Sequence, residues 1–172
     1  MHPTQVVALG YRYPNPTHRE SLATAVASLS SGVASRQMGQ FLDEVSELEL
    51  GQWEELHTRT LDLSPAFVPY VGHVTWGENY RRGEFMADLK RDMTEHGVDL
   101  GGELPDHIEP ILRYLAVVPE PRADLLEVLP GAVTTMESTL AAADKANPYR
   151  HVLAATVAVV QDLKPVMIGV AR

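Results

Sequence analysis

The residues best suited to chemistry in this chain lie in one segment, Glu103-Leu104-Pro105-Asp106-His107-Ile108-Glu109. A carboxylate beside an imidazole could transfer protons or ligate a metal ion if partner groups stood at suitable spacings. No histidine lies three or four residues from His107, and His73 and Glu78 are five residues apart, a poor spacing for a metal site on a helix. The segment therefore favours binding over catalysis.

Known catalytic and nucleotide-binding motifs are absent from the sequence. It contains neither G-x-x-x-x-G-K-[ST] nor G-x-G-x-x-G, and neither H-E-x-x-H nor G-x-S-x-G. Because the chain has no cysteine, it has no thiolate nucleophile, no zinc–thiolate site and no disulfide. We expect a protein that is not an enzyme, with no catalytic, metal-binding or cofactor-binding residues.

The charged segment predicts the start of a helix. Asp106 can cap the helix with its carboxylate, and Glu109, three residues later, can bond back to the backbone N–H of the cap residue. The apolar residues that follow share one helical face, which we expect to be buried: Ile108, Ile111, Leu112 and Leu115.

Apolar residues repeat at helical spacing along most of the chain. The further stripes are Leu22, Val26 and Leu29; Met38, Phe41, Leu42, Val45 and Leu48; Phe67, Tyr70, Val71 and Val74; Phe85, Met86, Leu89 and Met93; Leu126, Leu129, Val133, Met136 and Leu140; and Val152, Leu153, Ala155, Thr156 and Val159. Residues 5–9 fit a strand or a helix equally well. We predict an all-α fold, a single-domain bundle of roughly seven to nine helices over residues 1–172.

Several residues predict where these helices begin and end. Asn79 and Asn147 are suitable N-caps, and Gly97 is a suitable stop. The last helix should end before Pro165. Pro130 should kink or split the helix that contains it, because proline has no N–H to donate and clashes with the preceding turn.

Tyr70, His73 and Trp76 follow one another at intervals of three on the helix predicted after Pro65. An aromatic stripe of this kind is usually part of the core, which is the interpretation we favour. The alternative is a groove that takes an amphipathic helix of a partner.

Arg81 and Arg82 lie at the start of the next predicted helix, where positive charge is unfavourable against the helix dipole. This indicates a compensating anion. The candidates are Glu78, Asp106 or a phosphate-bearing ligand, and an internal ion pair is favoured.

Length and charge narrow the function classes further. A chain of 172 residues with 45% hydrophobic residues suits one domain with a sizeable core. Its net charge of -9 argues against nucleic-acid binding, and suits a basic partner such as an arginine-bearing peptide. The start of the sequence shows no signal peptide, and its longest apolar run, Val152 to Val160, is too short to span a bilayer. We expect a cytoplasmic protein that does not insert into membranes.

A series of short motifs, taken in order and spacing, resembles the NarJ branch of the molybdoenzyme assembly chaperones. These proteins are also called nitrate reductase delta subunits and are related to the TorD and DmsD chaperones. The motifs are Thr60-Leu61-Asp62-Leu63-Ser64-Pro65; Tyr70 and His73; Gly77-Glu78; Arg82-Gly83; Met86 and Leu89; Gly97; and Glu103-Leu104-Pro105-Asp106-His107. Leu9-Gly10-Tyr11 and Asn147-Pro148-Tyr149 resemble the family's opening and its closing helix.

The resemblance implies an all-helical, TorD-like cytoplasmic chaperone dedicated to one molybdenum enzyme, with nitrate reductase as the default. Such a protein binds the N-terminal segment of the catalytic subunit and holds it ready for insertion of the bis-molybdopterin guanine dinucleotide cofactor. It can delay membrane targeting until then. It is not expected to retain the cofactor, and cofactor-biosynthesis proteins are possible further partners.

The resemblance also implies which residues bind the client peptide: Glu103, Asp106, His107, Tyr70, His73, Trp76, Glu78 and Arg82. On this interpretation, Glu103, Asp106 and His107 stand at the exposed head of a core helix. Two alternatives remain open. One is a helical ligand sensor or enzyme that uses Asp106, His107 and Arg82, and the other is a helical interaction module with no molybdoenzyme client.

Overall fold

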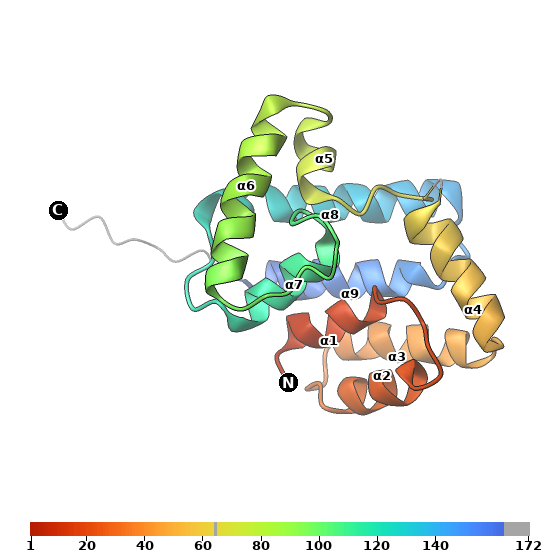
Figure 1. Ribbon diagram of the computed structural model, residues 1–172. Coiled ribbons are helices and arrows are strands. Elements are labelled where there is room, and N and C mark those ends of the chain that lie inside the picture. Colours follow the sequence, from red (N-terminus) through yellow and green to blue (C-terminus); the bar gives the residue numbers. More distant parts are fainter. Residues whose placement is uncertain (64, 164–172) are drawn as a thin grey trace.

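The computed structural model describes residues 1–63 and 65–163, and within these ranges the protein consists of helices and loops, with no strand (Figure 1). The helices are α1 (Pro3–Gly10), α2 (His18–Ala27), α3 (Val33–Ser46), α4 (Leu50–His57), the π-helical turn η1 (Thr58–Asp62), α5 (Val71–Trp76), α6 (Tyr80–Glu95), α7 (Ile108–Val117), α8 (Ala123–Ala143) and α9 (Tyr149–Gln161). The all-α prediction is confirmed. Ser64 and Pro165, which belong to an expected motif and an expected helix end, lie outside the described residues.

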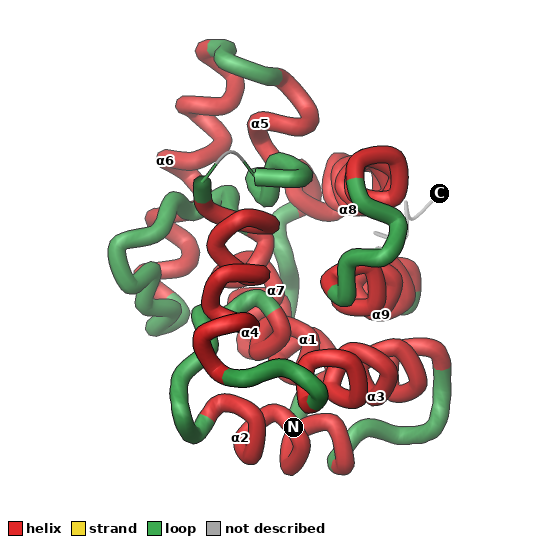
Figure 2. Tube along the Cα trace, turned by 90° about the vertical axis from the view of Figure 1, so that its right-hand side faces the viewer, coloured by secondary structure: helices red, strands yellow, loops and turns green. Residues whose placement is uncertain are grey.

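The core is built around α9, which packs against α3 on one side and α8 on the other (Figure 2). α1 packs along α7 and also contacts α9, so the first and last of these helices are neighbours. The largest fully buried side chains include Trp53, Tyr114, Tyr149, Phe41 and Phe67. Each large apolar side chain buried in this way contributes about 1.5–3 kcal/mol to folding.

Several expected helices form as the sequence predicts. The stripes of α3, α6 and α7 face the core, with their main apolar residues buried. The Asn79 side chain accepts the backbone N–H of Arg81 at 3.0 Å, and Gly97 follows α6 with a φ of 70°. The Asn147 side chain accepts the N–H of Tyr149 at 2.9 Å. Residues 5–9, which were ambiguous from the sequence, belong to helix α1.

The helix expected after Pro65 is shorter than predicted. α5 begins at Val71, while Phe67 is buried in the preceding loop and Tyr70 is extended, with φ -115° and ψ 112°. Pro69 explains the difference, because a proline disfavours helical conformation in the residue before it. Tyr70 therefore does not lie on one helical face with His73 and Trp76.

The longest described helix, α8, runs from Ala123 to Ala143 with Pro130 inside it, so of the two predicted outcomes, a kink or a split, the split does not occur. Leu129 and Val133, on either side of Pro130, are both fully buried. Their burial offsets the loss of the hydrogen bond that proline cannot make.

None of the helices in the described part of the chain has the length and apolar character that crossing a membrane requires.

Helix α4 is not among the helices predicted from the sequence. Its first turn is closed by the N–H of Glu49, which donates to Oε1 of Gln52 at 2.8 Å. Glutamate is not among the usual N-cap residues, so the start was not recognised. The helix buries Trp53, Leu56 and His57 and leads directly into η1.

Candidate functional site

Most of the eight residues predicted from the resemblance come together where the α5–α6 hairpin meets the start of α7, while Trp76 contacts Phe85 and Arg81 within the hairpin. In Figure 1 this hairpin projects from the upper part of the molecule. Two backbone hydrogen bonds join the segments that carry the site: the N–H of Val71 donates to Asp106 at 2.8 Å, and the N–H of Ile108 donates to Pro69 at 2.9 Å. They flank an isolated antiparallel bridge between Tyr70 and His107.

An ion pair between Arg82 and Asp106 lies at the centre of the site. Nε of Arg82 is 2.9 Å from Oδ2 of Asp106, and Nη2 is 3.4 Å from Oδ1. The Asp106 side chain is fully buried, and the Arg82 side chain is 11% exposed. The hydrogen bond to Asp106, chiefly, raises the pKa of Arg82. The predicted internal ion pair is therefore present.

Two predictions about Asp106 are wrong. It does not cap α7, because its carboxylate is engaged by Arg82, and it is not exposed to a partner. Glu109 does not bond back to the cap either. Its carboxylate accepts hydrogen bonds from Arg12 at 3.1 Å and from Arg113 at 2.8 Å. The spacing of residues around Asp106 could not predict these contacts. The arginines lie on α6, in the loop after α1 and on the next turn of α7.

Gly72 leaves the space that the ion pair occupies. A Cβ atom at this position would lie 2.8 Å from Oδ2 of Asp106 and 3.1 Å from Cγ of Arg82. Both distances are shorter than ordinary van der Waals contact, so a larger residue must displace the carboxylate or the guanidinium. Sequence reasoning missed Gly72, since its helical position gives no signal apart from its place between Tyr70 and His73.

His107 caps α7 in place of Asp106. Its Nδ1 accepts the backbone N–H of Glu109 at 3.1 Å, which requires Nδ1 to carry no proton. The ring packs edge-on against Tyr70, with centroids 5.1 Å apart, and the residue is buried. Burial lowers the pKa of His107, against the opposing effect of the carboxylates around it, which keeps the ring in the neutral form that the cap needs. The prediction that His107 is exposed is wrong.

Acidification should therefore destabilise the protein. The pKa of His107 and that of His18 both lie below the ordinary value of 6.5, mainly because of burial. Below pH 6.5, the unfolded chain therefore binds more protons than the folded chain. The contribution of the neutral histidines to the free energy of unfolding is complete above this pH and decreases as the pH falls below it. Each such histidine contributes a slope of up to about 1.4 kcal/mol per pH unit.

Urea unfolding between about pH 7 and pH 5 measures this slope. His107→Asn is the matched variant, because asparagine also caps helices but does not titrate in this range. We expect a shallower slope for the variant. An unchanged slope would mean that His107 does not contribute.

Tyr70 and Glu103 form the outer part of the site. The Tyr70 hydroxyl donates to Oε1 of Glu103 at 2.9 Å, and the same oxygen accepts the N–H of Leu104. Burial, and then Glu103, raises the pKa of Tyr70 to about 12. The Arg82 guanidinium lies over the Tyr70 ring, 5.7 Å from its centroid. Both Tyr70 and Glu103 are partly exposed, and Leu104 beside them is exposed.

The remaining predicted residues lie on the hairpin. Nδ1 of His73 is 3.2 Å from Oε1 of Glu78, and Nη1 of Arg82 is 3.4 Å from the same oxygen. Glu78 is 82% exposed. Trp76 is partly buried, packing edge-on against Phe85 with the rings 5.1 Å apart. Arg82 thus connects the buried Asp106 with the exposed Glu78.

The site divides into a buried support and a partly exposed surface. The Arg82–Asp106 ion pair and the packing of His107 against Tyr70 hold the two segments in place. Tyr70, Glu103, His73, Trp76 and Glu78 form the accessible part. In the described residues, no three histidine, aspartate or glutamate side chains are grouped so as to hold a metal ion. The arrangement is suited to contacts with a partner through hydrogen bonds, charge and aromatic surface.

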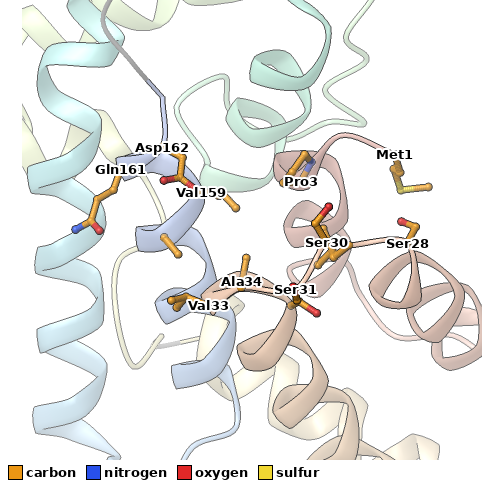
Figure 3. A pocket seen from close by; sticks show the side chains of 14 residues that line it. Met1, Pro3, Ser28, Ser30, Ser31, Val33, Ala34, Val159, Gln161 and Asp162 are labelled. Carbon is orange, nitrogen blue, oxygen red and sulfur yellow. The ribbon is translucent and has the colours of Figure 1, made fainter.

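A pocket of about 410 Å³ lies elsewhere, between the start of α3, the end of α9 and the N-terminus (Figure 3). It is lined by the loop of residues 28–32 and by small and apolar side chains that include Val33 and Val159. Among the described residues that line it, Asp162 is the one with a charged side chain, and none belongs to the predicted site.

Comparison with known proteins gives two curated relatives. The chain is 28% identical over 128 residues to the nitrate reductase molybdenum cofactor assembly chaperone NarJ of Escherichia coli K12. The protein of the same name from Escherichia coli O157:H7 matches equally. The match covers 69% of this chain and 52% of each relative, so the chain spans about half the length of the curated relatives it matches. No protein-family model matches the chain.

Proposed function

We propose that this protein is a dedicated chaperone that binds the N-terminal segment of a molybdoenzyme catalytic subunit and assists insertion of its molybdenum cofactor before targeting. The observation that carries the proposal is the similarity to two molybdenum cofactor assembly chaperones, both named for nitrate reductase. A nitrate reductase-like enzyme is therefore the first candidate client. The chaperone would act in the cytoplasm and release the subunit after cofactor insertion, without retaining the cofactor.

The geometry of the site supports a binding role. Tyr70, Glu103 and Glu78 present a hydroxyl and two carboxylates at the surface, and Trp76 adds aromatic area beside them. These groups are suited to a peptide that carries both apolar and basic residues. The Arg82–Asp106 pair holds this surface rigid from below, which lowers the entropy lost on binding.

The alternative is an enzyme or ligand sensor that uses Asp106, His107 and Arg82, and it is disfavoured because these side chains are engaged in internal contacts. Asp106 and Arg82 are engaged with each other, and Nδ1 of His107 is engaged by the helix cap. A general interaction module with no molybdoenzyme client is distinguished by affinity purification from the native cell. A chaperone of the proposed kind recovers one large apo-oxidoreductase, whereas such a module does not.

Calorimetry tests the proposal directly. The probes are synthetic peptides that span the N-termini of the molybdoenzyme catalytic subunits encoded in the same genome. We expect one of them to bind, and Glu103→Gln or Tyr70→Phe to weaken binding several-fold, as loss of a partly exposed polar contact does. Glu127→Gln, an exposed acid on α8, is the matched control and should bind as the wild type does.

Two results together would refute the proposed function. One is that no such peptide binds the wild-type protein. The other is that deletion of the gene leaves molybdoenzyme activity intact.

A further inference from the structure

The surface between the start of α3, the end of α9 and the first residues of the chain contains two pockets, of about 410 Å³ and about 150 Å³. Pro3, Val159 and Asp162 line both pockets, so the two adjoin and form one α3–α9 hollow. Val33 on α3 and Val159 on α9 come from the two helices that border it, and the loop of residues 28–32 lines it as well (Figure 3).

Apolar side chains at this hollow are exposed to solvent. Met1 is 64% exposed and Val33 is 49% exposed, although both line the larger pocket. The same pocket is lined by the buried Val159 and the partly buried Leu29. Among the described lining residues, Asp162 is the one with a carboxylate. The hollow therefore fits an apolar segment with a positive charge beside it, because burial of apolar surface is favourable and Asp162 attracts a cation.

The chain continues directly after the hollow with a segment of this composition. Leu163 lines the smaller pocket, and residues 164–172, which follow it, lie outside the described part of the chain. Their sequence is Lys164-Pro165-Val166-Met167-Ile168-Gly169-Val170-Ala171-Arg172. Four large apolar side chains thus fall within residues 166–170, with a basic residue on either side. Leaving such a run in water is unfavourable.

The segment is close enough to reach the hollow. An extended chain spans about 3.3–3.6 Å per residue, so residues 164–170 cover up to about 25 Å from Leu163. The end of α9, from which the segment continues, itself borders the hollow through Val159 and Asp162. A short connection gives the segment a high effective concentration at this surface. An exposed ion pair with Asp162 contributes little, so apolar burial would be the main driving force.

We propose that residues 166–170 dock in the α3–α9 hollow and cover Met1 and Val33 with their apolar side chains. The basic residues that flank the segment then lie near Asp162. Because α3 and α9 pack against each other in the core, the docked segment joins the surface ends of this helix pair. Docking does not depend on the proposed function, since the hollow and the candidate site share none of the described residues.

Disulfide trapping tests the position of the segment, because the chain has no cysteine of its own. In the full chain, Val33→Cys is combined in turn with Val166→Cys, Ile168→Cys or Val170→Cys. A disulfide needs Cα atoms within about 7 Å of each other, so mild oxidation should link at least one of these pairs within a single chain.

Glu127→Cys, combined with the same three substitutions, is the matched control. Glu127 is exposed on α8, the other helix that packs along α9, but it does not line the hollow. The disulfide to residue 33 should form at least about fivefold faster than the disulfide to residue 127, because docking raises the effective concentration at one position only. Equal rates, or no disulfide with Val33→Cys, would overturn the docking. A disulfide between two chains would assign the hollow to a second copy and overturn it as well.

Amide hydrogen exchange gives a second measurement, which needs no cysteine. In the wild-type chain, residues 166–170 should exchange about tenfold or more slowly than in a synthetic peptide of residues 164–172, because exchange then requires release of the segment. Val33→Asp should restore fast exchange, since it places a charge beneath the apolar side chains. An acid suits the first turn of α3, so this variant should keep its fold, which circular dichroism checks.

Exchange at the rate of the free peptide in the wild-type chain would contradict the docking. Slow exchange that persists in Val33→Asp would place the segment elsewhere and contradict it too. Neither result bears on the proposed function, which the calorimetry of molybdoenzyme peptides decides separately.

Discussion

Replacing Asp106 by alanine should lower the free energy of unfolding by about 3–5 kcal/mol, because it leaves the guanidinium of Arg82 buried without its partner. The Asp106 carboxylate is fully buried and accepts two hydrogen bonds from Arg82. A buried charge without compensation is among the largest single-residue penalties in proteins. Urea or thermal unfolding followed by circular dichroism measures the loss.

A second substitution separates the charge effect from the loss of volume. In the Asp106→Leu/Arg82→Met double variant both charges are removed, so the protein should recover much of the stability lost by Asp106→Ala. If Asp106→Ala costs less than about 1 kcal/mol, in the range of an exposed pair, the ion pair does not support the site as described. Binding of the client peptide should fall with stability in the single variant and return in the double variant.

Gly72→Ala should also destabilise the protein, by about 1–3 kcal/mol, although alanine usually stabilises a helix relative to glycine. The added methyl group would lie 2.8 Å from Asp106 and 3.1 Å from Arg82, and therefore must push the ion pair apart. The matched control is Gly83→Ala on α6, where nothing lies within 4 Å of the added Cβ. That variant should be more stable than the wild type by about 0.5–1 kcal/mol.

The comparison of the two glycine variants is the decisive part of the test. Both replace a helical glycine by alanine, so their helix propensities change alike. Equal stability changes in Gly72→Ala and Gly83→Ala would show that space beside Asp106 is not limiting. Opposite signs would show that Gly72 is required by the ion pair.

The sequence could predict features that depend on neighbouring residues alone. The stripe of Ile108, Ile111 and Leu112 defines the buried face of α7 because its spacing matches the helical repeat. Asn79 was recognised as the cap of α6 because its side chain accepts an N–H only two residues away, so that no distant partner is involved. The all-α fold follows from many such local signals that agree with one another.

Features that depend on distant partners could not be predicted in the same way. The sequence predicts Asp106 as the cap of α7, but Arg82, which comes from another helix, engages its carboxylate, and His107 caps the helix instead. The sequence did suggest Asp106 or Glu78 as the partner of Arg82, and the structure has both in contact with it. Exposure was the main error, because a polar residue at a helix start can be buried as soon as a cation satisfies it.

The roles predicted for the remaining site residues stay predictions. The structure brings Tyr70, His73, Trp76, Glu78 and Glu103 to one region, although three separate loops and helix α5 carry them. Their proximity could be inferred from the sequence only through the resemblance. Whether they contact a client is decided by the peptide measurements proposed above.

The bridge between Tyr70 and His107 closes residues 72–105 into a long loop, because it holds the two ends of this segment together. The entropy of closing such a loop depends only weakly on its length. The outer turn at Gly77 can therefore accept inserted residues at small thermodynamic cost, while Val71 and Ile108 keep the two ends together. Among related chains, variation in length should concentrate at the tip of the α5–α6 hairpin and spare its base.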